Sequence, residues 1–268
     1  MSKPSLPSPD EILAREARAR RIAAYAALAS AMLVVIAMLL EYKLAHADVP
    51  DFDASDLVQT LAAVHSGEPF PRSFLTAVGE FRLQHNTINL AIWALRGCSV
   101  LLLLPMAQLL IGAVRHRGGQ LAGWVAPANL IGVIVVALAA FVIFGVLEPG
   151  IYRTARDAGF LPSDVWDAVR ASPINTAQIV QFAGSVLAGI TLALASMQAI
   201  RVGLLSKVLG YIGVLVGLMF VFPLDQSNIV RAFWFGALAF TVSGRLPNTP
   251  PGWVSGTAVA PEPRQPKS

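Results

Sequence analysis

Six segments of the sequence are apolar, nearly free of charge and close in length to a membrane-spanning helix. A helix needs about 20 mostly apolar residues to cross the hydrocarbon core of a bilayer. Because the chain lacks the charge to cover such segments in water, the pattern predicts an all-α, polytopic membrane protein with six transmembrane helices. The six segments are Ile22–Leu40, Ile88–Val114, Leu121–Leu147, Ala177–Ile200, Val208–Leu224 and Ile229–Val242.

The composition supports this interpretation. Charged residues make up 13% of the chain and apolar residues 55%, whereas an ordinary soluble domain has about 25% charged residues. These fractions exclude a disordered chain and a nucleic-acid-binding domain, and they disfavour a soluble enzyme. The single cysteine, Cys98, excludes an intrachain disulfide and a cysteine-based metal cluster.

The charges on the connections between segments alternate in sign. The N-terminal tail, the turns at Arg115–Gln120 and Arg201–Lys207, and the C-terminal tail together hold twelve basic and four acidic residues. The opposite side, including the outer ends of the segments, holds seven basic and twelve acidic residues. Since an excess of Lys and Arg marks cytoplasmic loops, we expect a plasma-membrane protein with both termini in the cytoplasm.

The chain is therefore predicted to have three parts. Residues 1–21 form a cytoplasmic N-terminal helix or tail, because Ser8, Pro9 and the two acids that follow are typical of a helix start. Residues 22–243 form the six-helix transmembrane domain. Residues 244–268 are rich in Pro, Gly and Ser and are predicted to be a disordered cytoplasmic tail, with Trp253 at the inner membrane interface.

Two long acidic loops, Ala45–Thr87 and Glu148–Asn175, lie on the outer side in this topology. Each contains a short amphipathic stretch that opens with Ser-Asp, at Ser55 and at Ser163. We expect two short outer-loop helices that lie on the membrane surface or cap the bundle. An internal duplication remains an alternative explanation for the pair.

The first span has a second interpretation. Ala45-His46-Ala47 resembles a signal-peptidase site that follows a basic region and an apolar stretch. The apolar stretch of about 19 residues is longer than the 7–15 residues that are usual in a leader. We therefore expect the segment to be retained as a transmembrane helix, and cleavage after Ala47 is the alternative.

Polar residues within the spans predict an outer polar layer. Arg96 lies 18 residues from Val114, at the cytoplasmic end of the second segment. At 1.5 Å per residue this is roughly 27 Å, near the outer boundary of a core about 30 Å thick. The same count along other segments reaches Glu41, Gln181 and Asp225. Because a buried charge requires a partner, Glu41 or Asp225 is predicted to pair with Arg96.

Two polar stripes at helical spacing belong to this layer. They are His85, Asn89 and Arg96 in the second segment, and Gln178 and Gln181 in the fourth. One interpretation is hydrogen bonding and ion pairing between helices, which would fix the bundle. The other is a polar cavity that opens outward and holds a small ligand.

Three glycines form a small-residue face on the fifth segment. They are Gly210, Gly213 and Gly217, and the last two have GxxxG spacing. Small residues let helix backbones approach closely in a membrane. We expect this face to pack against a neighbouring span, and a homodimer contact is the alternative.

The sequence lacks the motifs of common catalytic and cofactor sites. HExxH, a P-loop and Gly-x-Ser-x-Gly are all missing. We therefore expect no enzyme activity, no cofactor and no metal. The predicted function is a non-enzymatic structural or interaction role in the plasma membrane, with the lipid bilayer and a membrane protein or a second copy as partners, and no nucleic acid. The alternative is a small-molecule transporter or ligand-binding protein with an outward-facing polar cavity.

Residues 202–213 place a basic turn before Leu-Gly-x-x-Gly at the start of the fifth segment. Pro223 ends that segment, Trp234 lies in the sixth, and Gly-Arg and Pro-Pro-Gly-Trp follow at 244–245 and 250–253. This layout resembles uncharacterised bacterial, actinobacterial-type six-span integral membrane proteins of a domain-of-unknown-function family. The resemblance implies the six-span fold and transfers no activity to any residue.

Overall fold

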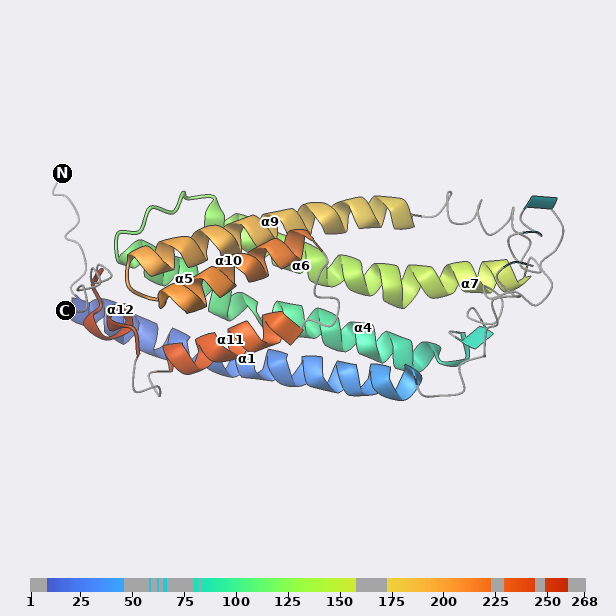
Figure 1. Cartoon of the computed structure of the whole chain (residues 1–268), viewed down its shortest axis with the longest axis horizontal. Coiled ribbons are helices and arrows are strands. Elements are labelled where there is room, and N and C mark those ends of the chain that lie inside the picture. The colour runs from blue at the N-terminus through green and yellow to red at the C-terminus, as the bar shows by residue number, and fades with distance from the viewer. Residues whose placement is uncertain are drawn as a thin grey trace. The chain divides into compact units, whose positions relative to one another are not determined.

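The computed structural model describes residues 9–45, 58, 62, 65–66, 80–81, 83–157, 173–222, 229–243 and 249–259. Every regular element in these residues is a helix, which confirms the all-α prediction (Figure 1). Two apolar helices, Lys207–Val221 and Ile229–Val242, are short, so six crossings remain a prediction. The helices that are long and apolar enough to cross a membrane are Glu16–Leu44, Asn86–His116, Val125–Thr154 and Ile174–Arg201.

The first helix, α1, runs from Pro9 to Ala45 without interruption. Its first turn contains Asp10 and Glu11, whose negative charge is favourable at the positive end of the helix dipole. The charged N-terminal segment therefore passes directly into the first apolar segment, as the sequence predicts. Charged and apolar side chains consequently lie along one continuous helix.

The second apolar segment forms two helices where the sequence predicts one. They are α4, Asn86–Leu101, and α5, Leu104–His116. Pro105 lies in the first turn of α5 and has no N–H to donate to the preceding turn. The chain tightens at this point, because the Leu103 N–H donates to the Val100 carbonyl at 3.1 Å.

The third apolar segment continues farther than predicted. It consists of α6, Val125–Ala140, the π-helix η1, Phe141–Leu147, and α7, Glu148–Asp157. The outer loop predicted from Glu148 onward is therefore helical as far as Asp157, because η1 passes directly into α7.

Three further apolar or partly apolar helices follow, and then a short one. They are α9, Ile174–Arg201, α10, Lys207–Val221, α11, Ile229–Val242, and α12, Pro251–Ser255. Ser206 caps α10, because its hydroxyl accepts a hydrogen bond from the Leu209 N–H at 3.2 Å.

The chain divides into two compact units. Unit 1 contains residues 1–34, 98–135 and 182–268, and unit 2 contains residues 35–97 and 136–181. Leu110 of α5 and Trp234 of α11 are fully buried in unit 1. Ile92 of α4 and Ile143 of η1 are buried in unit 2. Each unit therefore has an apolar core of its own.

Glycines bring α9 and α10 of unit 1 into backbone contact. A Cβ atom added at Gly217 would lie 2.6 Å from the carbonyl oxygen of Gly189, and one added at Gly189 would meet the carbonyl oxygen of Gly217. Gly210 and Gly213 also face side chains of α9 closely. The three predicted packing glycines, Gly210, Gly213 and Gly217, thus make their contacts within the chain.

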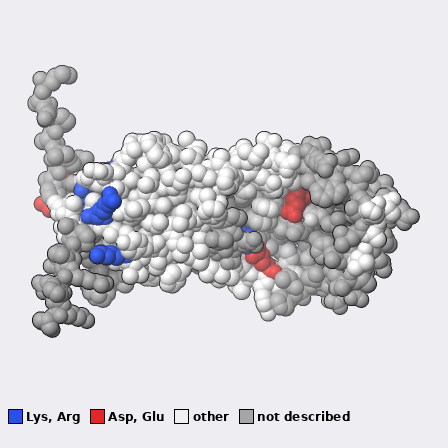
Figure 2. Space-filling model, turned by 45° about the horizontal axis from the view of Figure 1, so that its top comes forward, with Lys and Arg blue, Asp and Glu red and all other residues white. Residues whose placement is uncertain are grey.

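Large apolar side chains are exposed along several helices. Ile179 of α9 is 70% exposed and Phe233 of α11 is 71% exposed. Asn129 and Thr191, by contrast, are buried. Figure 2 shows that a broad part of the described surface carries no Lys, Arg, Asp or Glu side chain. The described surface is therefore far more apolar than that of a soluble protein, in which charged and polar residues are mostly exposed.

The C-terminal region differs from its prediction. Residues 249–259 contain α12 and a buried Trp253, although the whole range 244–268 is predicted from its composition to be disordered. Some other predicted features lie outside the described residues. These features are the amphipathic stretches that open at Ser55 and Ser163, the candidate partner Asp225, and Ala47.

Candidate functional site

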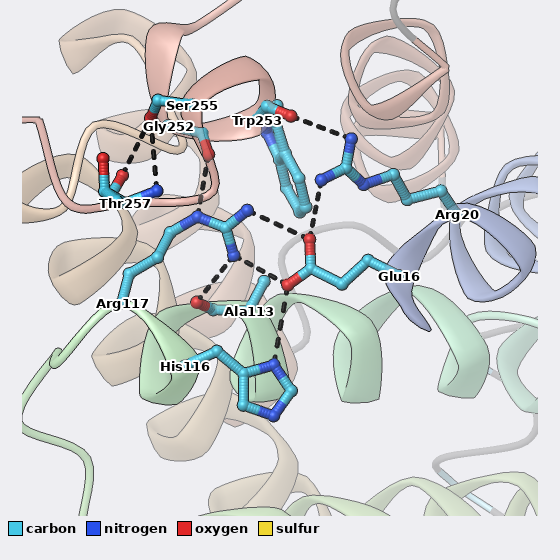
Figure 3. A network of polar contacts seen from close by, with 9 residues as sticks. All are labelled: Glu16, Arg20, Ala113, His116, Arg117, Gly252, Trp253, Ser255 and Thr257. Atoms are coloured by element: carbon cyan, nitrogen blue, oxygen red, sulfur yellow. Dashed lines mark hydrogen bonds and ion pairs between the residues drawn. The ribbon is translucent and has the colours of Figure 1, made fainter. Parts of the chain in front are cut away.

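A cluster of buried charged side chains lies in unit 1, where α1, the end of α5 and α12 meet (Figure 3). We name its members, Glu16, Arg20, Arg117 and Trp253, the Glu16 cluster. Two of them come from α1, one from the C-cap position of α5 and one from α12. The cluster therefore joins segments that are far apart in the sequence.

The carboxylate of Glu16 is held by two guanidinium groups. Arg117 donates from its two terminal nitrogens to the two carboxylate oxygens, at 2.7 and 3.0 Å. Arg20, one turn along α1, donates to Oε2 at 2.7 Å. The side chain of Arg117 is 0% exposed and that of Glu16 is 4% exposed. Because burial removes the hydration of each ion, the pair depends on this bidentate geometry and on the second arginine.

Each of the two arginines also donates a hydrogen bond to α12. The Nε atom of Arg117 donates to the Gly252 carbonyl at 2.8 Å, and Nη1 of Arg20 donates to the Trp253 carbonyl at 2.9 Å. Figure 3 shows the indole ring of Trp253 between the two guanidinium groups, whose central carbons lie 4.9 and 5.4 Å from its centroid. Cation–π attraction and hydrogen bonding therefore act on the same short helix.

Backbone contacts with the turn between α9 and α10 also position α12. The Gly252 N–H donates to the Gly203 carbonyl at 3.0 Å. Gly203 has a φ of +73°, in the left-handed region that favours glycine. A Cβ atom added at Gly252 would lie 2.8 Å from the Gly203 carbonyl oxygen. The Pro- and Gly-rich segment is thus ordered by contacts distant in sequence, which its composition does not reveal.

The sequence pattern does not predict the Glu16 cluster as a site. Glu16 and Arg117 are 101 residues apart. Each lies in a segment that the sequence assigns to the cytoplasmic connections, where charged side chains are expected to be exposed to water. Two signals point to it: Glu16 is one acid within a strongly basic run, and the prolines at 250 and 251 precede Trp253 as a helix start would require. Neither signal identifies Arg117 as the partner of Glu16.

In unit 2, the structure contains the ion pair predicted between Arg96 and Glu41. The Nη2 atom of Arg96 lies 2.6 Å from Oε1 and 2.7 Å from Oε2 of Glu41. The side chains are 13% and 36% exposed, respectively. The guanidinium of Arg96 also lies 4.9 Å from the ring centroid of Trp93. The alternative partner, Asp225, lies outside the described residues.

The polar stripe on α4 continues toward η1. The side-chain amide of Asn89 donates to the Phe144 carbonyl at 3.2 Å, and the ring of Trp93 stacks on that of Phe144 at 4.2 Å. His85 contacts the Phe81 carbonyl through Nδ1 at 2.9 Å. These side chains are therefore occupied by contacts within unit 2.

The structure does not bring the glutamines of α9 into this group. Gln178 is exposed and Gln181 is partly exposed. Among the residues that the structure describes, neither glutamine makes a hydrogen bond with Arg96 or Glu41. Three residues of the predicted outer polar layer, Glu41, Arg96 and Asn89, are therefore linked by contacts through Trp93 and Phe144. The two glutamines are not part of this group.

Replacing Arg96 with alanine is expected to lower the free energy of unfolding by about 1 kcal/mol, because water still reaches the Glu41 carboxylate and weakens the pair. Arg96→Lys should lower the free energy of unfolding by less than Arg96→Ala does. A double-mutant cycle of Arg96→Ala with Glu41→Gln should show a coupling energy between the two residues above about 0.5 kcal/mol. Unfolding of the purified chain in mixed SDS micelles measures these values. Arg153→Ala, an exposed arginine of α7, is the control, and zero coupling in the cycle would refute the pair.

A chain of buried and partly buried polar side chains crosses the interior of unit 1. Gln108 donates to the side-chain oxygen Oδ1 of Asn129 at 3.2 Å, and the side-chain amide of Asn129 donates to the Thr191 hydroxyl at 3.0 Å. Thr191 in turn donates to the Leu187 carbonyl at 2.7 Å. Because α5, α6 and α9 each supply one member, the chain ties three helices together. In the sequence these residues are scattered and predict no contact.

No family model matches the chain, and comparison with curated proteins and with solved structures gives no significant match. Within the described part of the chain, no three His, Cys, Asp or Glu side chains are grouped so as to hold a metal ion. Buried polar side chains such as Glu16, Arg117, Asn129 and Thr191 instead contact other polar groups, and these contacts connect helices.

Proposed function

We propose that this chain is a six-span integral protein of the plasma membrane, with both termini in the cytoplasm and a non-enzymatic structural or interaction role. Four helices of sufficient length and hydropathy support insertion in a membrane. The charge asymmetry of the sequence supports the orientation. The proposal treats the shorter α10 and α11 as the fifth and sixth crossings.

One observation carries the proposal: the described surface is extensively apolar, as the core is, while several polar side chains are buried. Side chains such as Ile179 and Phe233 are exposed, whereas Asn129, Arg117 and Glu16 are buried. In a bilayer, exposed apolar side chains contact lipid and polar side chains are favoured inside the bundle. In water, the same surface would be an extended apolar patch prone to aggregation.

The contacts of the polar groups support a structural role over ligand transport. Arg96 and Glu41 contact each other directly, which favours an ion pair that fixes helices over a pair of charges that flank a ligand. The Glu16 cluster likewise has its charged atoms directed at one another and at backbone carbonyls. A rigid cytoplasmic end would suit a protein that presents a fixed surface to a partner.

Cysteine labelling tests the topology. In a Cys98→Ser background, we expect Gln120→Cys and Lys207→Cys to react with an impermeant maleimide only after the membrane is opened, and His65→Cys to react in intact cells. The three positions are exposed, so accessibility reports the side of the membrane. Reaction of position 120 in intact cells would refute the proposed orientation. Recovery of the chain in the soluble fraction would refute the membrane location.

A further inference from the structure

A cavity of about 390 Å³ lies in unit 1 beside α1, α11 and α12. Its volume falls within the range of about 300–1,000 Å³ that is typical of small-molecule sites. The residues that line it and carry the inference are Arg20, Arg21, Tyr25, Leu28, Phe240 and Trp253. The cavity adjoins the Glu16 cluster, because Arg20 and Trp253 belong to both.

The lining changes from charged to apolar along α1. Arg21, Tyr25 and Leu28 are spaced four and three residues apart and so lie on one face of the helix. At 1.5 Å per residue, the guanidinium end and Leu28 are separated by roughly 10 Å along the axis. Phe240 and Val254 add apolar walls. A ligand that fills the cavity therefore needs a polar end and an apolar body.

The charge at the polar end selects an anion. The carboxylate of Glu16 is shared by Arg20 and Arg117, so the cluster keeps an excess positive charge. Arg21 is exposed, lines the cavity and makes no ion pair or hydrogen bond with another described residue. Its guanidinium is thus available for a phosphate, which it can bind through two parallel N–H groups.

We propose that this cavity binds one anionic phospholipid, with the phosphate at Arg21, next to the positively charged Arg20, and an acyl chain along Tyr25, Leu28 and Phe240. The inference rests on the proposed membrane location, in which the positive-inside orientation places these arginines at the inner surface. The inner leaflet is rich in anionic lipids, and basic pockets between transmembrane helices on this side bind their headgroups. The indole of Trp253 suits the boundary between headgroup and acyl chain.

Native mass spectrometry of the delipidated full chain in detergent tests the proposal. The probes are dioctanoyl phosphatidylglycerol, dioctanoyl phosphatidylcholine and inorganic phosphate. We expect phosphatidylglycerol to bind in preference to phosphatidylcholine, and Arg21→Gln to weaken its binding about fivefold, the effect of one basic residue near the membrane surface. Arg21→Lys should retain most of the affinity.

Arg18→Gln is the matched control, since Arg18 is exposed on the same helix but does not line the cavity. It should change binding less than twofold. Equal loss in both variants would show a diffuse surface charge and overturn the site. Equal binding of the two lipids, or displacement of phosphatidylglycerol by equimolar inorganic phosphate, would overturn the lipid as occupant. A chain that stays in the membrane fraction but fails these tests would refute this inference while leaving the proposed function intact.

Discussion

Replacing Glu16 with glutamine is expected to lower the free energy of unfolding by about 3–5 kcal/mol, the usual cost of removing one partner of a buried ion pair. The substitution keeps the size of the side chain but removes the charge that two guanidinium groups share. Arg117 has no exposed side-chain surface, so water cannot compensate. Arg20 and Arg117 would then repel each other around a neutral amide.

Unfolding of the purified chain in mixed SDS micelles measures the loss. Asp10→Asn is the matched control, because Asp10 is an exposed acid on the same helix, and its loss should cost less than about 1 kcal/mol. The double variant Glu16→Gln/Arg117→Gln should recover part of the stability, since it removes the fully buried Arg117 charge that the loss of Glu16 leaves without a partner. If Glu16→Gln costs no more than Asp10→Asn, water reaches the cluster and its proposed structural role fails.

The same substitution should release α12. The carbonyl oxygens of Gly252 and Trp253 are held by the arginines that Glu16 orients. Loss of that orientation leaves α12 with its backbone contact to Gly203. We therefore expect faster amide exchange at residues 251–255 in Glu16→Gln than in the native chain. The charge of Glu16 thus stabilises α12 indirectly, through the side chains of Arg20 and Arg117.

Features that depend on local sequence were predictable. The start of α1 at Pro9 follows from a proline and acids in the first turn. An ion pair of Arg96 with an acid at the same depth, Glu41 or Asp225, was predictable because helices rise uniformly, so that counting residues from one boundary gives the depth of each side chain. The break before α5 also had a local signal in Pro105, which the apolar character of the surrounding segment obscures.

Features that depend on tertiary contact were not predictable. Nothing near Glu16 specifies Arg117 as its partner, because the contact spans 101 residues. The helix around Trp253 forms in a composition typical of disorder, and it is stabilised by donors from α1 and the end of α5. The link from Gln108 through Asn129 to Thr191 requires the relative rotation of three helices, which periodicity in a single sequence does not fix.

The contact between α9 and α10 gives a second large expected effect. Gly189→Ala should lower the free energy of unfolding by about 2–3 kcal/mol, as overpacking does when neighbours cannot move. The added methyl group would meet the carbonyl oxygen of Gly217 and lie 2.9 Å from Val221. The carbonyl belongs to a helix backbone, so the helices must separate. In a bilayer, where apolar burial between helices gains little, such separation removes the main attraction between them.

Gly236→Ala is the matched control, because a Cβ atom added at Gly236 of α11 meets nothing within 4 Å. It should raise the free energy of unfolding by about 0.5–1 kcal/mol, since alanine loses less conformational entropy than glycine in a helix. Both variants make the same chemical change in a helix. Changes of opposite sign in the free energy of unfolding would therefore isolate the effect of the backbone contact. A small or favourable effect of Gly189→Ala would mean that α9 and α10 can separate at little cost. The close approach of Gly189 and Gly217 would then have no part in holding the bundle together.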